Sequence, residues 1–233
     1  MAPAVDVVSD SAGTFTDDTS WSHAAAASGV IGVCVGIVAI PGGGSGLADQ
    51  IKGVTYGGSA MSEATGSPNV TDTGTEDFVV HKFYLTSSVP QGTQTVAIDA
   101  SATTMTKCAW AMTVTGTGTG EVDAVLTTQA STGEMTGTLA TTASTATAIG
   151  MVMAAGPDVT GWTAGSGWTL DNAEVDFGGQ TAAFQSRTAA GGNVTTDSNY
   201  PGPGTEEWKL FALAIREAAA SNITWTVPAP IGF

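Results

Sequence analysis

The chain has 233 residues, and its 21 aspartates and glutamates against six lysines and arginines give a formal net charge of −15. Six scattered cations cannot neutralise a run of phosphates, which excludes nucleic-acid binding through a basic surface. Hydrophobic residues make up 42% of the chain, enough for a sizeable core, so a disordered protein is also excluded.

β-Branched and alternating runs recur along the chain between clusters of Gly, Pro, Ser and Asp, which is the spacing of an all-β sandwich. The predicted strands, in chain order, are Ala4–Ser9, Val30–Ile40, Gly53–Tyr56, Phe78–Leu85, Gln94–Ala100, Lys107–Thr115, Glu134–Leu139, Thr147–Ala154, Thr181–Arg187 and Glu207–Ile215. The prediction is therefore one antiparallel β-sandwich domain over residues 1–220, of jelly-roll or immunoglobulin-like type.

The stretch Ala24–Ile40 imitates a membrane segment, but it has only about 17 residues where a span needs about 20. Glycines interrupt it, and acidic residues rather than a basic region precede it, so we expect a loop and a buried strand, with no membrane span and no export signal. Cys34 and Cys108 each lie in an apolar run, which favours free buried thiols over a disulfide.

Two further segments have a definite local chemistry. The glycines of Tyr56-Gly57-Gly58-Ser59 predict a tight hairpin, because they tolerate positive φ. Thr205–Ala220 is ambiguous: Trp208, Phe211 and Ile215 have a helical spacing, but the nearly continuous apolar run also fits a strand buried on both faces.

Residues 221–233 differ in character from the rest and are predicted to form an extended C-terminal tail. Two prolines favour an extended path, and the aromatic and aliphatic side chains are costly to leave in water. Such a tail either lies back on its own domain or inserts into a neighbouring subunit. The candidate interface residues are Trp225, Val227, Pro228, Pro230, Ile231 and Phe233.

The sequence predicts no catalytic, cofactor or metal site. His23 and His81 are isolated in sequence, and the acidic loop Asp171–Asp176 lacks the complete spacing of a calcium loop. Ser22 precedes His23, but a catalytic triad needs a third, orienting group that the sequence does not identify. With 21 acidic residues, any carboxylate pair is too easily proposed to indicate glycoside hydrolysis.

Trp162 and Trp168 flank a glycine-rich stretch and are the remaining candidates for a ligand-binding site. Exposed on a loop, the two indoles could stack on sugar rings; packed across the edge of the sandwich, they would be core residues. Both alternatives fit the sequence.

Several short sequence motifs of the chain occur together in a recognisable order. They are Trp21-Ser22-His23, Gly53–Met61, Lys82–Leu85, Val89–Ile98 and Trp208–Arg216. The chain resembles, over about residues 4–216, a family of β-sandwich domains of tailed-phage structural proteins and prophage-related bacterial proteins. The shared phrases are signatures of turns and core, so the resemblance speaks for the fold more than for the function, and it implies that Glu207–Ile215 is a strand.

The resemblance implies a non-enzymatic virion structural protein, most simply a capsid decoration, cement or spike protein that stabilises the capsid surface. Its partners would be the major capsid protein or other virion proteins, within a homo-oligomer, with a trimer as the guess by analogy. Its location would be the virion, assembled in the host cytoplasm. The alternative is a carbohydrate-binding module of a tail fibre or secreted protein, acting through Trp162 and Trp168.

Overall fold

The computed structural model describes residues 2–40, 51–69, 79–100, 106–130, 135–142, 145–156, 162–171, 175–176, 180–199 and 208–219. Within these ranges the regular structure is all β, and every strand pair is antiparallel. The predicted class, an all-β fold of sandwiched antiparallel sheets, is thereby confirmed.

The first half of the chain forms two facing sheets. One has the order β1-β9-β3-β7-β6 and the other β2-β8-β4-β5. The strands are β1 (Ala4–Asp10), β2 (Thr19–Ala24), β3 (Val30–Ile40), β4 (Ile51–Tyr56), β5 (Ser59–Ala60), β6 (Ser62–Glu63), β7 (Val79–Leu85), β8 (Thr93–Ala100) and β9 (Thr106–Thr115).

The second half also forms two sheets, with the orders β10-β18-β12-β16-β14 and β11-β17-β13, and β15 pairs with β16. The strands are β10 (Gly120–Ala130), β11 (Thr136–Ala140), β12 (Thr147–Ala155), β13 (Thr163–Ala164), β14 (Thr169–Leu170), β15 (Val175–Asp176), β16 (Thr181–Ala189), β17 (Asn193–Asn199) and β18 (Trp208–Glu217).

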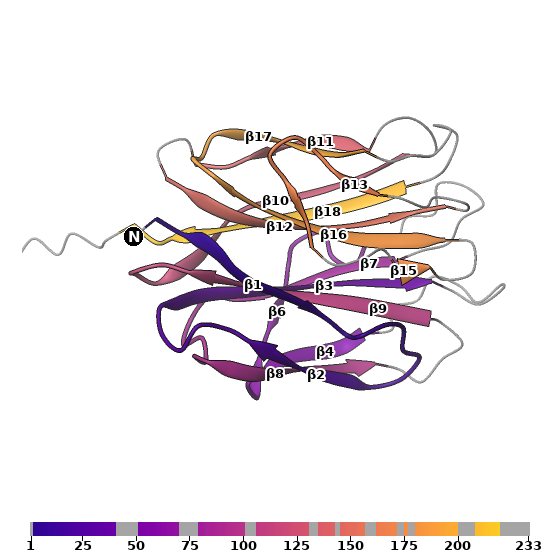
Figure 1. Ribbon diagram of the computed structural model, residues 1–233, viewed down its shortest axis with the longest axis horizontal. Coiled ribbons are helices and arrows are strands. Elements are labelled where there is room, and N and C mark those ends of the chain that lie inside the picture. Colours follow the sequence, from indigo (N-terminus) through magenta and orange to yellow (C-terminus); the bar gives the residue numbers. More distant parts are fainter. Residues whose placement is uncertain are drawn as a thin grey trace, which may run out of the picture.

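The four sheets are stacked as four layers, with the two larger sheets inside and the two smaller ones outside (Figure 1). Three apolar clusters fill the three gaps between them. Because β3, β12 and β18 lie in the inner layers, nearly all of their residues are buried, on both faces of the strand. Such strands read as continuous apolar runs.

The two halves share one topology and one register. In the first half Gly36 of β3 is paired with Trp110 on one side and with Lys82 on the other. In the second half Val152 of β12 is paired in the same way with Phe211 and Phe184. All strands of the first half except β5 therefore have counterparts in the second half, where β15 is the additional strand, and the described chain is two sandwiches of similar design.

The two sandwiches meet through equivalent positions. A Cβ atom on Gly36 would lie 2.9 Å from the Cβ of Val152, and one on Gly150 would lie 3.0 Å from the Sγ of Cys34. The Lys82 Nζ lies 4.7 Å from the ring centroid of Phe184. Contact between equivalent positions is the property of an isologous interface, so the halves are related by an approximate two-fold axis.

The ten predicted strands all occur in the structure, with ends that differ by a few residues. The ambiguous segment Thr205–Ala220 contains strand β18, as the reading of a doubly buried strand and the resemblance both implied. The predicted hairpin is also present: Gly57 and Gly58 have φ of 55° and 79° between β4 and β5. The sequence reading did not foresee β2, β10, β17 or the short strands.

Candidate functional site

The predicted interface residues of the tail are not part of the described structure. Residues 220–233 lie outside the described ranges, so the roles of Trp225, Val227, Pro228, Pro230, Ile231 and Phe233 stay predictions. The boundary predicted at residue 220 also stays a prediction.

The two candidate sugar-stacking tryptophans lie in the core of the second sandwich. Trp162 is 4% exposed and Trp168 is 6% exposed. The Trp162 Nε1 donates to the Thr181 hydroxyl at 3.0 Å, and the Trp168 Nε1 donates to the Thr195 carbonyl at 3.2 Å. These placements correspond to the core alternative, and they leave little ring surface for stacking on a sugar.

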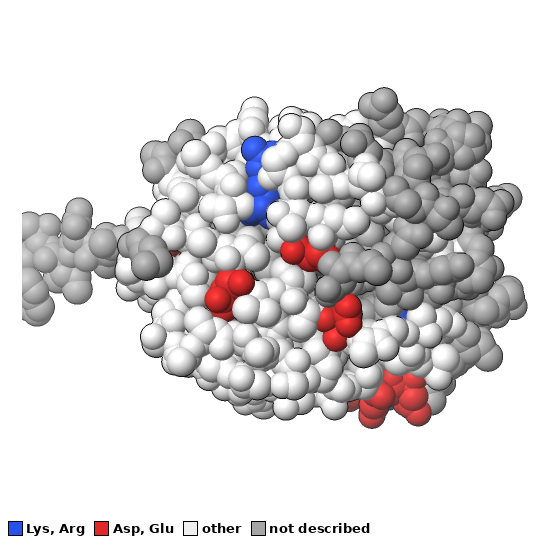
Figure 2. Space-filling view, in the orientation of Figure 1, with Lys and Arg blue, Asp and Glu red and all other residues white. Residues whose placement is uncertain are grey.

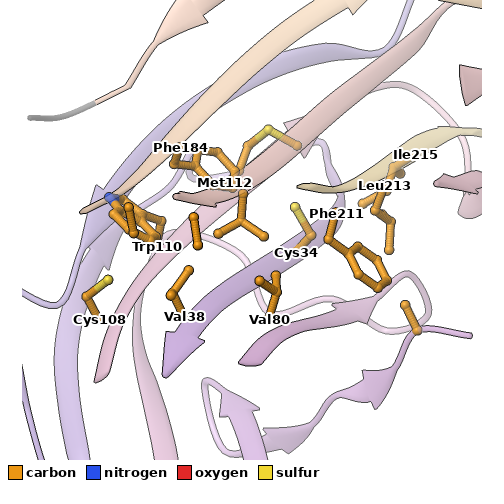
Figure 3. Packing of buried hydrophobic residues seen from close by; sticks show 14 of the residues in the cluster. Cys34, Val38, Val80, Cys108, Trp110, Met112, Phe184, Phe211, Leu213 and Ile215 are labelled. Atoms are coloured by element: carbon orange, nitrogen blue, oxygen red, sulfur yellow. The ribbon is translucent and has the colours of Figure 1, made fainter. Parts of the chain in front are cut away.

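The cysteines are free and buried, as the sequence favoured. Both lie in the cluster between the two sandwiches, together with Trp110, Phe184 and Phe211 (Figure 3). Burial raises the pKa of both thiols, which keeps them protonated and unreactive at neutral pH.

Three of the four lysines lie in the interior, where the sequence alone would place none. Lys82, Lys107 and Lys209 are each fully buried. The Lys82 Nζ donates to the Gly150 carbonyl of the other sandwich at 3.0 Å, and the Lys107 Nζ donates to the Thr16 carbonyl at 3.0 Å. Burial lowers the pKa of Lys82 and of Lys107, because it disfavours the charged amine.

The outer surface is correspondingly poor in cations. Figure 2 shows one face on which charged residues are few and well separated among uncharged ones. Lys52 pairs with Asp99, Arg216 pairs with Glu121 and Asp123, and the Arg187 guanidinium lies 5.9 Å from the Trp168 ring.

A buried polar network links the two sheets of the first sandwich through His23. The His23 Nδ1 lies 2.6 Å from the Ser9 hydroxyl, and its Nε2 lies 3.1 Å from the Thr113 hydroxyl. Thr113 donates to the Asp6 carboxylate at 3.2 Å, and the Trp21 Nε1 donates to the Ser9 hydroxyl at 2.9 Å. Because Thr113 gives its proton to a carboxylate, it accepts from Nε2–H, and Ser9 donates to the bare Nδ1.

This network suits a neutral imidazole. Burial lowers the pKa of His23 to about 4, with the nearby Asp6 carboxylate opposing the shift. Burial, reinforced by Asp6, raises the pKa of Tyr56 to about 12; its ring lies 6.0 Å from that of His23, edge to face. Each side chain of the network around His23 has a hydrogen-bond donor or acceptor as its partner. The network therefore links β1, β2 and β9 structurally.

The sequence pointed to Ser22 beside His23, but alternation along β2 leaves Ser22 exposed while His23 is buried. The partners of His23 come instead from β1 and β9, 14 and 90 residues away in the chain. A single sequence carries no signal for such long-range pairing.

An open hollow lies on the outer sheet of the first sandwich. Strands β2, β4 and β8 form an open hollow of about 670 Å³, lined by side chains that include Thr55, Met61 and Ala97. Its rim carries Lys52 and Asp99, whose Nζ and Oδ1 lie 3.5 Å apart. The Asp18 carboxylate, also on the rim, accepts the Ala100 N–H at 2.9 Å.

Metal-binding geometry is not found among the described residues, which contain no group of three or more His, Cys, Asp or Glu side chains able to hold an ion. Of the acidic stretch Asp171–Asp176, residues 172–174 lie outside the described ranges. Burial raises the pKa of Asp171. The described part of the chain also contains no helix with the length and hydropathy to cross a bilayer.

Comparisons with protein-family models, with curated proteins and with solved structures find no match for this chain. The resemblance to phage structural domains therefore rests on the sequence phrases described above and stays a prediction.

Proposed function

We propose that the protein is a non-enzymatic structural component of a tailed-phage virion, a capsid decoration, cement or spike protein that stabilises the surface it covers. The observation that carries this proposal is that the buried polar side chains described above form structural hydrogen bonds. Lys82, Lys107 and His23 all hydrogen-bond across strands or sheets, in the manner of groups that hold a framework together.

The outer sheets support a role in surface packing. The exposed positions of β8 in the first sandwich and of β11 in the second include Thr93, Thr95, Thr136 and Thr138. Hydroxyl-bearing side chains on the exposed face of a sheet form hydrogen bonds to a partner without the desolvation cost of charged groups. The net charge of −15 keeps such a protein soluble before assembly.

Segment 221–233 is proposed to be the arm that docks on a neighbouring subunit. Burying about 300–500 Å² of its apolar surface corresponds to a gross gain near 10 kcal/mol at about 25 cal/mol per Å², before ordering costs remove much of it. An arm of this kind joins subunits without requiring complementary charges.

The test is a binding experiment with capsids of a tailed phage whose genome encodes this chain, prepared without the protein. We expect the purified protein to sediment with these capsids, to appear on their surface in negative-stain images, and to raise the temperature at which they disrupt. Capsids that neither bind the protein nor gain stability would contradict the proposal. A glycan array run in parallel, with Trp168→Ala as the control, tests the carbohydrate-binding alternative.

A further inference from the structure

We propose that the hollow on the outer sheet of the first sandwich receives segment 221–233 of a second copy of this chain, so that copies join head to tail. The inference builds on the arm described under the proposed function and adds the surface that receives it. It rests on the position of the hollow, on its charge, and on the distance that the segment can span.

The hollow and the end of β18, the last described strand before the segment, lie toward opposite ends of the molecule. Strand β8 ends beside the hollow, and the chain then returns along the whole of β9. Beyond β9, the Ala218 N–H donates to the Thr119 carbonyl at 2.7 Å, which places the end of β18 at the far end of β9. In Figure 1 that is the end at which the N-terminus is marked.

The distance between these two places favours a neighbour's hollow over the segment's own. The ten residues of β9 span about 30 Å at about 3.3 Å per residue, and two layers of about 10 Å separate β18 from the outer sheet. The direct distance is therefore about 35 Å. Trp225 follows Ala219 by six residues, which reach at most about 20 Å. Trp225, the anchor of the segment in this proposal, consequently cannot reach the hollow of its own chain.

The charge of the hollow suits an uncharged apolar occupant. Segment 221–233 contains no Asp, Glu, Lys or Arg. Of the three charged groups at the rim, Lys52 and Asp99 pair with each other and Asp18 accepts the Ala100 N–H, and the rest of the lining is made of glycine, hydroxyl and aliphatic side chains. On a chain of net charge −15, an uncharged segment is the part that approaches a second copy with least repulsion.

The geometry also determines the type of assembly. A segment that leaves one end of the molecule and binds near the other end makes a heterologous contact, which generates a ring where the rotation closes and a filament where it does not. The trimer guessed by analogy would be one such ring.

Gly53 allows the hollow to be filled without disturbing the sandwich. It lines the hollow, and a Cβ atom added to it would meet no other atom within 4 Å. The matched control is Thr138→Trp, an exposed position on β11 of the second outer sheet. The change Trp225→Ala removes the anchor from the segment and leaves the described strands unaltered.

The experiment measures the molar mass of the full chain by size-exclusion chromatography with light scattering over a range of concentrations. We expect wild type and Thr138→Trp to assemble, and Gly53→Trp and Trp225→Ala each to weaken assembly at least tenfold. Excess synthetic peptide 221–233 should dissociate the wild-type assembly, which tests the hollow even if Gly53→Trp lowers the unfolding temperature. A monomeric wild type, or an assembly indifferent to the peptide and to Gly53→Trp, would overturn the proposal.

The experiments distinguish failure of the proposed virion function from failure of the proposed assembly through the hollow. A chain that assembles through the hollow but ignores capsids retains this inference and loses the virion function. A chain that binds capsids as a monomer retains the virion function and loses this inference.

Discussion

The two sandwiches of this chain share the order and register of most of their strands, but the spaces between their sheets are filled differently. The first sandwich contains the hydrogen-bonded chain of Asp6, Thr113, His23 and Ser9. The second contains methionines and the two buried indoles of Trp162 and Trp168. The same topology therefore accommodates a polar link or an apolar filling, because the backbone register and the alternation of buried positions define it.

In the space between the sandwiches, equivalent positions of the two halves hold different residues. Lys82 of the first sandwich occupies the position that Phe184 occupies in the second, and the two side chains contact each other. An approximate two-fold axis would place two like residues there. The substitution of one by the other turns a like pair into a cation–π pair, which two identical subunits cannot make in a symmetric dimer.

The largest expected effect comes from breaking the contact between the sandwiches. Trp110 is fully buried and stacks on Phe184 with ring centroids 6.3 Å apart. We expect Trp110→Ala to lower the free energy of unfolding by about 3–5 kcal/mol, because it leaves a cavity shared by both halves. Urea denaturation followed by circular dichroism measures the loss.

Trp168→Ala is the matched comparison, since its cavity lies within the second sandwich alone. Hydrogen exchange should then show reduced protection in both halves for Trp110→Ala, but in β12, β16 and β18 above all for Trp168→Ala. Equal loss of protection throughout the chain in both variants would mean that the two sandwiches unfold as one unit.

The polar link of the first sandwich predicts a loss of stability in acid. Because the pKa of His23 falls from 6.5 in the unfolded chain to about 4 in the folded one, the unfolded chain binds more protons between these values. Stability attributable to the neutral ring is complete above pH 6.5 and declines as the pH falls toward 4. At 1.36 kcal/mol per pKa unit the loss is about 3 kcal/mol. In His23→Gln the difference in stability between pH 7 and pH 4 should shrink by that amount.

A pH dependence of the same sign, in a higher pH range, is expected from the buried amine between the sandwiches. Burial lowers the pKa of Lys82, so the unfolded chain binds more protons and stability rises as the pH increases toward the unfolded value near 10.5. Lys82→Met should remove that dependence and stabilise the protein at pH 7 by about 1–3 kcal/mol. Thermal denaturation at pH 7 and pH 10 tests both statements; a destabilised variant would mean that the hydrogen bond to Gly150 outweighs the desolvation of the amine.

The smallest effect is expected at the rim of the hollow. The side chains of Lys52 and Asp99 are 59% and 62% exposed, and water and salt screen a pair in such a position. Lys52→Ala should change the free energy of unfolding by less than about 0.5 kcal/mol in chemical denaturation. A change above 1 kcal/mol would show that the pair supports the sheet beneath it.

Strands with one buried face or with two buried faces could be predicted from the sequence. Features that depend on contacts between residues far apart in the chain could not. β3 was predicted because an inner-layer strand is a continuous apolar run, whereas the similar run of β18 left a helix open and the resemblance favoured the strand. Strands β10 and β17 were missed because their runs, Gly-Glu-Val-Asp and Asn-Val-Thr-Thr, contain residues that also suit turns. The similarity of the two halves was missed as well, since equivalent positions hold residues as unlike as Lys82 and Phe184.

The candidate sites, like the strands, could be predicted only in so far as residue type indicates them. Residue type identified Trp162 and Trp168 as notable, but only the packing shows that their indoles face the core. The network around His23 joins positions 14 and 90 residues apart, and the hollow is formed by three strands that are not consecutive. Both are products of tertiary structure.

The burial of the lysines has a practical consequence for work with this protein. The chain has four lysines, and in the folded state Lys82, Lys107 and Lys209 are fully buried while Lys52 is exposed. An amine-reactive dye or linker applied to the native protein will therefore couple, among the side chains, to a single lysine at the rim of the hollow. The fold thus supplies its own reporter position, at which fluorescence would respond to whatever enters there.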